Sequence, residues 1–263
     1  MVELSFAVIL GIVEGLTEFI PISSTGHLIV AGYLLGFEGP KAATFEIFIQ
    51  LGAILAVVFL YKEHFRRMCT VQPLRGFAGR RAIVLLGLTS MPALLLGAGI
   101  HRIIKTYLFT PTSVALGLGL GGVGILLIEQ FPPRGKKFGL DALTPVDAVV
   151  VGLCQCLALW PGMSRSACTM VGGMAAGIER ETAAHYSFLA AVPIIFAATV
   201  FDLYKTLPIL QGSDVPMFAI GFVVSFMTAW FAIKFFLRFL ASHTLKPFGW
   251  YRIIFALGIL WLL

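Results

Sequence analysis

Two carboxylates, three consecutive hydroxyl side chains and one histidine occur within fourteen residues near the start of this sequence. In chain order they are Glu14, Glu18, Ser23, Ser24, Thr25 and His27. The stretch lies within a long apolar region, and an ionised side chain near the centre of a bilayer costs roughly 2.5–3.5 kcal/mol. Polar groups that are kept at such a cost indicate a site that binds a ligand or performs a reaction.

Glu14 and Glu18 are four residues apart, so a helix would place both carboxylates on one face. Two adjacent carboxylates repel each other unless one is protonated or a cation lies between them. A divalent metal ion, Mg²⁺ or Ca²⁺, would remove the repulsion, and Mg²⁺ in particular combines one or two carboxylates with substrate phosphates. A protonated glutamate, or one that reaches the membrane surface, is the alternative.

Pro21 separates these carboxylates from the hydroxyls and predicts a break between two helices. Ser23 or Ser24 can cap the helix that follows the break. The free N–H groups and the dipole at such a helix start favour an anion. His27 could serve there as a general base or as a nucleophile. Simple capping by the serines and a structural hydrogen bond of His27 are the alternatives.

A second polar break is predicted at residues 160–169, again between two short apolar segments. It contains Arg165, whose guanidinium group matches a phosphate group bidentately. Three hydroxyl donors flank this arginine: Ser164, Ser166 and Thr169. A purely structural ion pair with a glutamate of the first break is the alternative.

The composition indicates that these breaks lie in a membrane protein. Of 263 residues, 59% are hydrophobic and only 12% are charged, against about 25% charged residues in soluble domains. Several apolar runs reach the ~20 residues that cross a bilayer as a helix. The net charge of +6 fits Lys and Arg residues in cytoplasmic loops better than nucleic-acid binding. The four cysteines are too scattered to predict a disulfide framework or a zinc site.

We therefore expect an all-α polytopic membrane protein that forms a single domain over residues 1–263. Two re-entrant helix–loop–helix pairs are predicted at residues 4–37 and 147–178, because each half is too short to cross. Six transmembrane helices are predicted in addition: three after the first pair, at 45–61, 82–100 and 113–130, and three after the second, at 183–204, 216–238 and 250–263.

The two pairs resemble each other at a spacing of 141 residues, which falls to 140 after a one-residue gap near the proline. Glu14 then matches Gln155, Ser24 matches Ser164 and Thr25 matches Arg165. Because three crossings follow a pair that returns to its own side, the second copy enters from the opposite face. Residues 1–130 and 147–263 are thus predicted to form an inverted-topology repeat. The change from Glu14 to Gln155 favours one shared site over two equal ones.

The distribution of positive charge predicts an N-terminus outside the cell. The cytoplasmic segments then hold fourteen of the nineteen Lys and Arg residues: Lys62, Arg66, Arg67, Arg75, Arg80, Arg81, Arg134, Lys136, Lys137, Arg180, Lys234, Arg238, Lys246 and Arg252. The outer segments hold only Lys41, Arg102, Lys105 and Lys205.

The sequence resembles the undecaprenyl-diphosphate phosphatase family, also called the bacitracin-resistance protein family. The resemblance is carried by residues 14–27, by the segment 45–57 and by Pro161–Thr169, and it extends along essentially the whole chain. It implies an enzyme of the bacterial inner membrane that converts undecaprenyl diphosphate to undecaprenyl phosphate, the lipid carrier for peptidoglycan synthesis. It also implies a dependence on divalent cations and bacitracin resistance through turnover of this lipid. Because inverted repeats also suit a carrier, a transporter that flips undecaprenyl phosphate is the alternative.

We expect one site where the two breaks meet, open to the periplasm. The catalytic candidates are Ser24, His27, Glu18, Glu14 and Arg165. The candidate phosphate ligands are Ser23, Thr25, Arg165, Ser164, Ser166 and Thr169. The candidate metal ligands are Glu14 and Glu18, and the secondary candidates are Gln50, Glu46 and Gln155. Ser24 or His27 is the nucleophile. The expected partners are the polyprenyl diphosphate lipid and the bilayer, a homodimer is left open, and no nucleic acid is expected.

Overall fold

The computed structural model describes residues 2–70, 76–108, 110–133 and 137–262, and within these ranges the protein is almost entirely helical. The α-helices are α1 (Val2–Thr17), α2 (Ser24–Leu35), α3 (Pro40–Leu60), α4 (Lys62–Met68), α5 (Gly79–Ile103), α6 (Pro111–Gln130), α7 (Pro145–Leu157), α8 (Arg165–Ala175), α9 (Arg180–Thr206), α10 (Val215–Leu240) and α11 (Lys246–Leu262). A π-helical segment, η1 (Ile104–Leu108), extends α5. Residues 1 and 263 of the predicted domain, and the loop cations Arg75, Arg134 and Lys136, lie outside the described residues.

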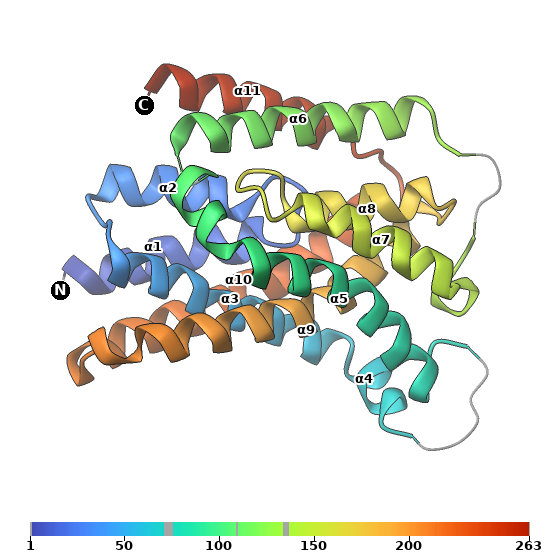
Figure 1. Ribbon diagram of the computed structural model, residues 1–263, viewed down its shortest axis with the longest axis horizontal. Coiled ribbons are helices and arrows are strands. Elements are labelled where there is room, and N and C mark those ends of the chain that lie inside the picture. The colour runs from blue at the N-terminus through green and yellow to red at the C-terminus, as the bar shows by residue number, and fades with distance from the viewer. Residues whose placement is uncertain (1, 71–75, 109, 134–136, 263) are drawn as a thin grey trace.

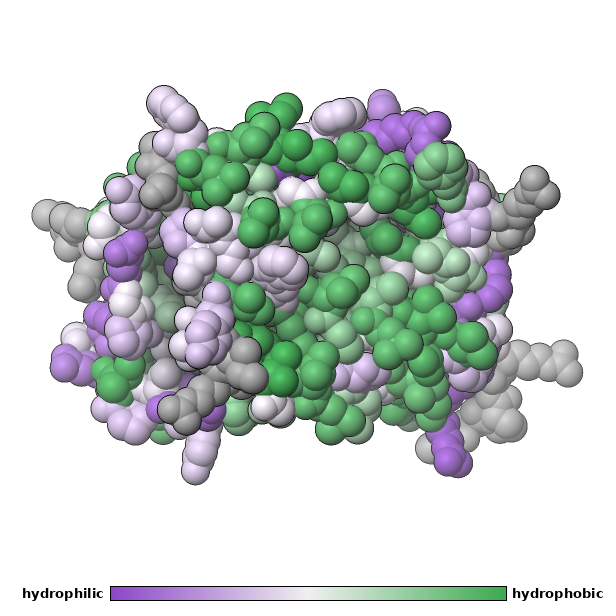
Figure 2. Space-filling model, turned by 45° about the horizontal axis from the view of Figure 1, so that its top comes forward, coloured by the Kyte–Doolittle hydropathy of each residue, from purple (hydrophilic) through white to green (hydrophobic). Residues whose placement is uncertain are grey.

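Five helices, α3, α5, α6, α9 and α10, are long and apolar enough to cross a membrane. The predicted all-helical membrane class is therefore confirmed, and the chain is a multi-pass membrane protein. The sixth predicted span, at 250–263, coincides with α11, which has 17 residues. Large apolar side chains such as Leu95, Phe231 and Ile254 are more than 60% exposed, as expected where lipid covers the surface. Figure 2 shows hydrophobic residues across the middle of one face and hydrophilic residues at its two ends.

The helices run mostly along the long axis of the molecule, and both chain termini lie at the same end (Figure 1). The pair α1–α2 extends from this end into the middle and back. The pair α7–α8 extends inward from the opposite end, where α4 also lies. The two breaks therefore meet in the interior. This arrangement brings residues that are about 140 positions apart in the sequence into contact.

The backbone takes the same unusual conformation in both breaks. Ser23 and Ser164 have φ angles of 72° and 67°, and among the described residues they are the non-glycine residues with positive φ. Each serine side chain caps the following helix by accepting from the N–H three residues later, in Gly26 and Ala167. Such conformations cost about 1–3 kcal/mol and persist when the surroundings hold them.

This shared conformation corrects the predicted alignment of the two breaks. Ser23 corresponds to Ser164, and Ser24 therefore corresponds to Arg165. The spacing stays at 141 residues through the break, and the one-residue gap was wrong. The gap had been placed so that two identical residues, Ser24 and Ser164, were aligned. The structure instead aligns the residues that share the positive φ and the capping role.

Arg252 on α11 holds both breaks in place. Its side chain is fully buried, and it donates to the carbonyl of Pro21 in the first break at 3.2 Å. It also donates to the carbonyls of Gly162 and Met163 in the second break, both at 2.9 Å. Two further bonds reach the carbonyls of Gly117 and Leu118 on α6. Carbonyl dipoles thus solvate a charge that has no water around it.

The assignment of Arg252 to a cytoplasmic segment was therefore wrong. The residue lies inside α11 and its guanidinium group points into the protein rather than into a loop. Helix α11 can lie close enough to α6 because glycines line their contact. A Cβ atom on Gly122 would lie only 2.7 Å from the carbonyl oxygen of Gly249.

Candidate active site

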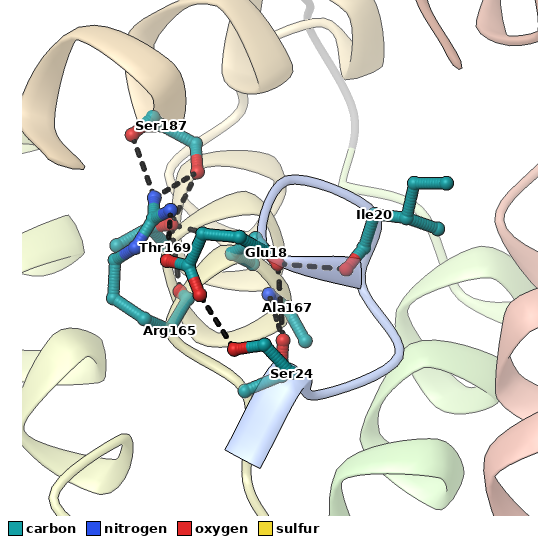
Figure 3. A network of polar contacts seen from close by, with 9 residues as sticks. Glu18, Ile20, Ser24, Arg165, Ala167, Thr169 and Ser187 are labelled. Carbon is teal, nitrogen blue, oxygen red and sulfur yellow. Dashed lines mark hydrogen bonds and ion pairs between the residues drawn. The ribbon is translucent and has the colours of Figure 1, made fainter. Parts of the chain in front are cut away.

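Three side chains that the sequence singled out meet in one buried network between the two breaks (Figure 3). The Ser24 hydroxyl donates to Glu18 Oε2 at 2.6 Å. Arg165 Nη2 donates to Glu18 Oε1 at 3.0 Å, and the two side chains are only 12% and 8% exposed. Glu18 and Ser24 come from the first break and Arg165 from the second. One carboxylate therefore joins a hydroxyl to a cation across the molecule.

Helix α9 fixes the guanidinium group of Arg165 from the other side. Its Nη1 donates to the carbonyl and hydroxyl oxygens of Ser187, at 2.9 and 3.3 Å. The Thr169 hydroxyl lies 2.6 Å from the Ser187 hydroxyl. The ring of Phe19 lies beneath the guanidinium carbon, 5.6 Å from it. Ser187 was not predicted, because a single serine in an apolar helix carries no sequence signal of a role.

The other hydroxyls of the second break bind backbone. Ser166 Oγ donates to the carbonyl of Ile20 in the first break at 3.2 Å, and it lies 3.0 Å from Ser164 Oγ. Thr169 Oγ1 donates to the carbonyl of Arg165 at 2.9 Å. Ser166 and Thr169 are fully buried. They hold the two breaks together and fix the start of α8.

A cleft of about 220 Å³ opens beside this network. Eight of the predicted site residues line it: Glu18, Ser23, Ser24, Thr25, Gln50, Gln155, Ser164 and Arg165. Five others are not among its lining residues: Glu14, His27, Glu46, Ser166 and Thr169. The cleft therefore unites the starts of α2 and α8, whose free N–H groups favour a bound anion.

His27 lies on the far side of the first break, against α11. Its Nδ1 is 2.8 Å from the carbonyl oxygen of Ser23, and its Nε2 is 2.7 Å from the Tyr251 hydroxyl. Because a carbonyl only accepts, Nδ1 carries the proton, and a neutral ring then accepts from Tyr251 at Nε2. The ring also stacks on Phe255, with 4.4 Å between centroids. Both nitrogens are thus engaged, and the base in contact with Ser24 is Glu18.

Glu14 is the unsatisfied carboxylate of the site. It is fully buried and neither of its oxygens has a hydrogen-bond partner. Glu18, Glu46 and Arg165 lie near enough to act on it electrostatically. The amide of Gln155, its counterpart in the second break, donates to the carbonyl of Thr89 at 2.9 Å, while its own oxygen has no partner. A bare carboxylate at such depth is costly unless a proton or a cation neutralises it.

The donor set suits an oxygen-preferring cation only in part. Among the described residues, no group of three or more His, Cys, Asp or Glu side chains could hold a metal ion. The two free oxygens of Glu14 fit Mg²⁺ or Ca²⁺, which take carboxylate ligands together with water or substrate phosphate. Both oxygens of Glu18 are already engaged, by Arg165 and Ser24. Glu18 would therefore have to share an oxygen between a metal and one of these contacts.

Comparison with known proteins gives a consistent result. Residues 7–258 match the model of a family described as bacitracin resistance protein BacA. The chain is 54% identical over 256 residues to the undecaprenyl-diphosphatase of Nitratidesulfovibrio vulgaris strain DP4, with 97% of each chain covered. It is 53% identical to the undecaprenyl-diphosphatase of Maridesulfovibrio salexigens, with the same coverage. It is 46% identical to undecaprenyl-diphosphatase 1 of Bacillus thuringiensis, covering 98% of this chain and 97% of that one.

Proposed function

The chain belongs to the family of bacitracin resistance protein BacA, and we propose that it removes the terminal phosphate of undecaprenyl diphosphate at the cleft between its two helix breaks. The products are undecaprenyl phosphate, which carries wall precursors across the membrane, and inorganic phosphate. Turnover of this lipid confers bacitracin resistance. The observation that carries the proposal is the contact of Ser24, Glu18 and Arg165 in one buried network.

In the first step the Ser24 hydroxyl attacks the terminal phosphorus. Glu18 accepts the hydroxyl proton, for which it is already in place at 2.6 Å. The bond from this phosphorus to the bridging oxygen breaks, and undecaprenyl phosphate leaves with the bridging oxygen. Arg165 and the N–H groups at the starts of α2 and α8 stabilise the charge on the transferring phosphoryl group. Glu18 then releases this proton to solvent and is again a base. Water attacks the phosphoserine and gives a proton to Glu18, the bond from phosphorus to Ser24 Oγ breaks, and Ser24 Oγ regains a proton as inorganic phosphate leaves.

His27 is the alternative nucleophile, and its two engaged nitrogens support Ser24 instead. A rapid-quench experiment with substrate labelled in the terminal phosphate separates the two. We expect label on the protein that survives acid, as phosphoserine does. Label that is lost in acid but stable in base would indicate phosphohistidine and overturn the assignment.

We propose that Glu14 holds a divalent cation, because its buried oxygens have no partner in the protein. The bound cation would neutralise charge on the diphosphate oxygens. Glu14→Gln removes the charge but keeps the shape, so we expect turnover to fall at least tenfold and the Mg²⁺ concentration for half-maximal activity to rise. Full activity of the wild type after exhaustive chelation would contradict this role. Glu46→Gln removes the charge of the neighbouring carboxylate, which like Glu14 does not line the cleft, and tests whether the effect is specific to Glu14.

The orientation in the membrane is also a proposal. Matching breaks that enter from opposite ends, and termini at one shared end, support an inverted repeat of residues 1–130 and 147–263 in the bacterial inner membrane. The end of the molecule that holds α4, with Lys62, Arg66 and Arg67, is the cation-rich end, and it faces the cytoplasm. The opposite end, from which α1–α2 extends inward, faces the periplasm, and the diphosphate enters from there. Cys69 is exposed at the cation-rich end. We expect a membrane-impermeant maleimide to label it only after cells are permeabilised, and labelling of intact cells would reverse the orientation.

The same repeat suits a carrier, so a flippase for undecaprenyl phosphate is the second candidate. Proteoliposomes that contain the purified protein separate the two functions. We expect release of inorganic phosphate from undecaprenyl diphosphate without transfer of undecaprenyl phosphate between leaflets. Transfer without phosphate release would instead support the carrier, and the enzyme proposal would fail.

A further inference from the structure

The cleft is lined by both polar and apolar residues. Ser24, Arg165 and the two helix starts form the polar part of the lining. Four of the apolar lining residues are aliphatic side chains that come from helices outside the two breaks. They are Ala93 on α5 and Ile194, Ile195 and Ala198 on α9. This polarity matches an amphiphile whose charged head lies at Arg165 and whose hydrocarbon tail points toward α5 and α9.

The cleft is too small to hold a long tail. Its volume of about 220 Å³ is below the ≈300–1,000 Å³ of pockets that enclose a drug-sized ligand. The diphosphate takes up part of this space. A long prenyl chain therefore has to leave the cleft, and its hydrophobicity requires that it leave into the hydrocarbon of the bilayer rather than into water.

Helices α5 and α9 are joined at one level and separate beyond it. The Tyr186 hydroxyl on α9 donates to the carbonyl of Leu85 at 2.9 Å and lies 2.6 Å from the Thr89 hydroxyl, both on α5. Past this junction the helices diverge toward the end of the molecule that holds the chain termini (Figure 1). The cleft residues Ala93 and Ile194 lie on this diverging part.

Each of the two helices contains a proline. Pro92 lies inside α5 and Pro193 inside α9, each next to a residue that lines the cleft. A proline in a helix removes one backbone hydrogen bond and disfavours straight packing against a neighbour. Leu95 on α5 and Phe196 on α9, which are close in sequence to lining residues of the cleft, are 66% and 57% exposed, so both helices also present apolar side chains at the protein surface.

The corresponding contact on the other side of the protein is closed. There α10 packs directly on α3, with Gly52 against the backbone of Phe222 and Gly221 against the side chains of Phe45 and Ile49. No side chain could be added at either glycine without displacing these neighbours. The contrast indicates that the separation of α5 from α9 is a specific feature of this side.

We propose that the prenyl tail of the substrate leaves the cleft between α5 and α9, over Ala93, Ile194 and Ala198, into the bilayer. This inference rests on the proposed function and adds the route of the tail to it. The small side chain of Ala198 leaves the mouth of the route open. A large side chain at this position obstructs a long tail and leaves room for a diphosphate whose tail ends inside the cleft.

The test compares undecaprenyl diphosphate with dimethylallyl diphosphate as substrates of the full-length protein in detergent. Ala198→Trp places a large ring at the mouth, and Ala198→Phe is a smaller obstruction that serves if the first variant does not fold. Val200→Trp is the matched control, because Val200 is also exposed on α9 but does not line the cleft. We expect the ratio of kcat/KM for the long substrate to that for the short one to fall at least tenfold in the Ala198 variants and to stay within twofold in the control.

The outcomes separate the route from the function. An unchanged ratio in the folded Ala198 variants, or an equal fall in the Val200 control, would overturn the route while hydrolysis by the wild type upholds the enzyme. A wild type that releases phosphate from neither substrate would instead overturn the proposed function on which the route depends.

Discussion

Ser24→Ala should lower kcat for phosphate release at least ~10³-fold, because loss of a nucleophile removes the covalent step and leaves only binding and charge stabilisation. The Ser24 hydroxyl donates to Glu18 and carries no cap, since Ser23 caps α2. The variant should therefore fold and bind the lipid. The measurement is the initial rate of phosphate release by purified protein, together with the binding of undecaprenyl diphosphate at equilibrium.

Ser225→Ala is the matched control for this variant. Ser225 is also fully buried in an apolar helix, and its hydroxyl has no hydrogen-bond partner. Its loss should leave kcat within twofold. Glu18→Gln alone should be nearly as damaging as Ser24→Ala, and the double variant should be no worse than the more damaged single one, because the two residues act as a unit. Multiplicative losses in the double variant would show that Glu18 does not act through Ser24.

Arg252→Met should destabilise the protein more than any substitution at a residue that lines the cleft. The change leaves the carbonyls of Pro21, Gly162 and Met163 buried without their donor. Each unsatisfied group costs about 1–3 kcal/mol, and both breaks contain a strained serine that depends on its surroundings. The measurement is thermal unfolding in detergent, followed by kcat of the protein that remains folded.

Arg252→Lys and Arg238→Met complete this experiment. A lysine keeps the charge but cannot form five bonds from one planar group, so it should recover only part of the stability. Arg238 is exposed on α10, and its loss should change neither the unfolding temperature nor kcat. If Arg252→Met unfolded at the temperature of the wild type with normal turnover, the proposed role of Arg252 in holding the breaks would be wrong.

The chemistry of the site was easier to predict from the sequence than its geometry. Polar residues in apolar segments are costly, so Glu18, Ser24 and Arg165 were identifiable by type and place alone. Their contact was predicted from the resemblance of the two breaks, and in the structure Glu18 and Arg165 lie 3.0 Å apart. The backbone of the breaks was not predictable to the residue, because serine at positive φ is rare and sequence identity favoured the wrong serine pair.

Arg252 and Ser187 could not be identified in this way. Arg252 lies near the start of an apolar helix, where a loop cation and a buried cation give the same sequence pattern. Only the structure shows that α11 carries the arginine into the interior, where backbone carbonyls replace a carboxylate partner. His27 illustrates the opposite case. Its sequence neighbours predicted a catalytic role, which stays a prediction, and the structure places Nε2 of its ring 2.7 Å from the Tyr251 hydroxyl.

The contact between Glu18 and Arg165 makes the carboxylate an internal competitor for the phosphate that Arg165 is proposed to bind. Any phosphate ligand must displace the Glu18 carboxylate, so its apparent affinity is its intrinsic affinity multiplied by the fraction of molecules in which the ion pair is open. The bilayer holds the tail of the diphosphate lipid and so keeps its head group near the cleft, whereas free inorganic phosphate has no tail and diffuses away. If Arg165 binds phosphate as proposed, the same ion pair that orders the resting site works against product inhibition and favours release of phosphate after each turnover.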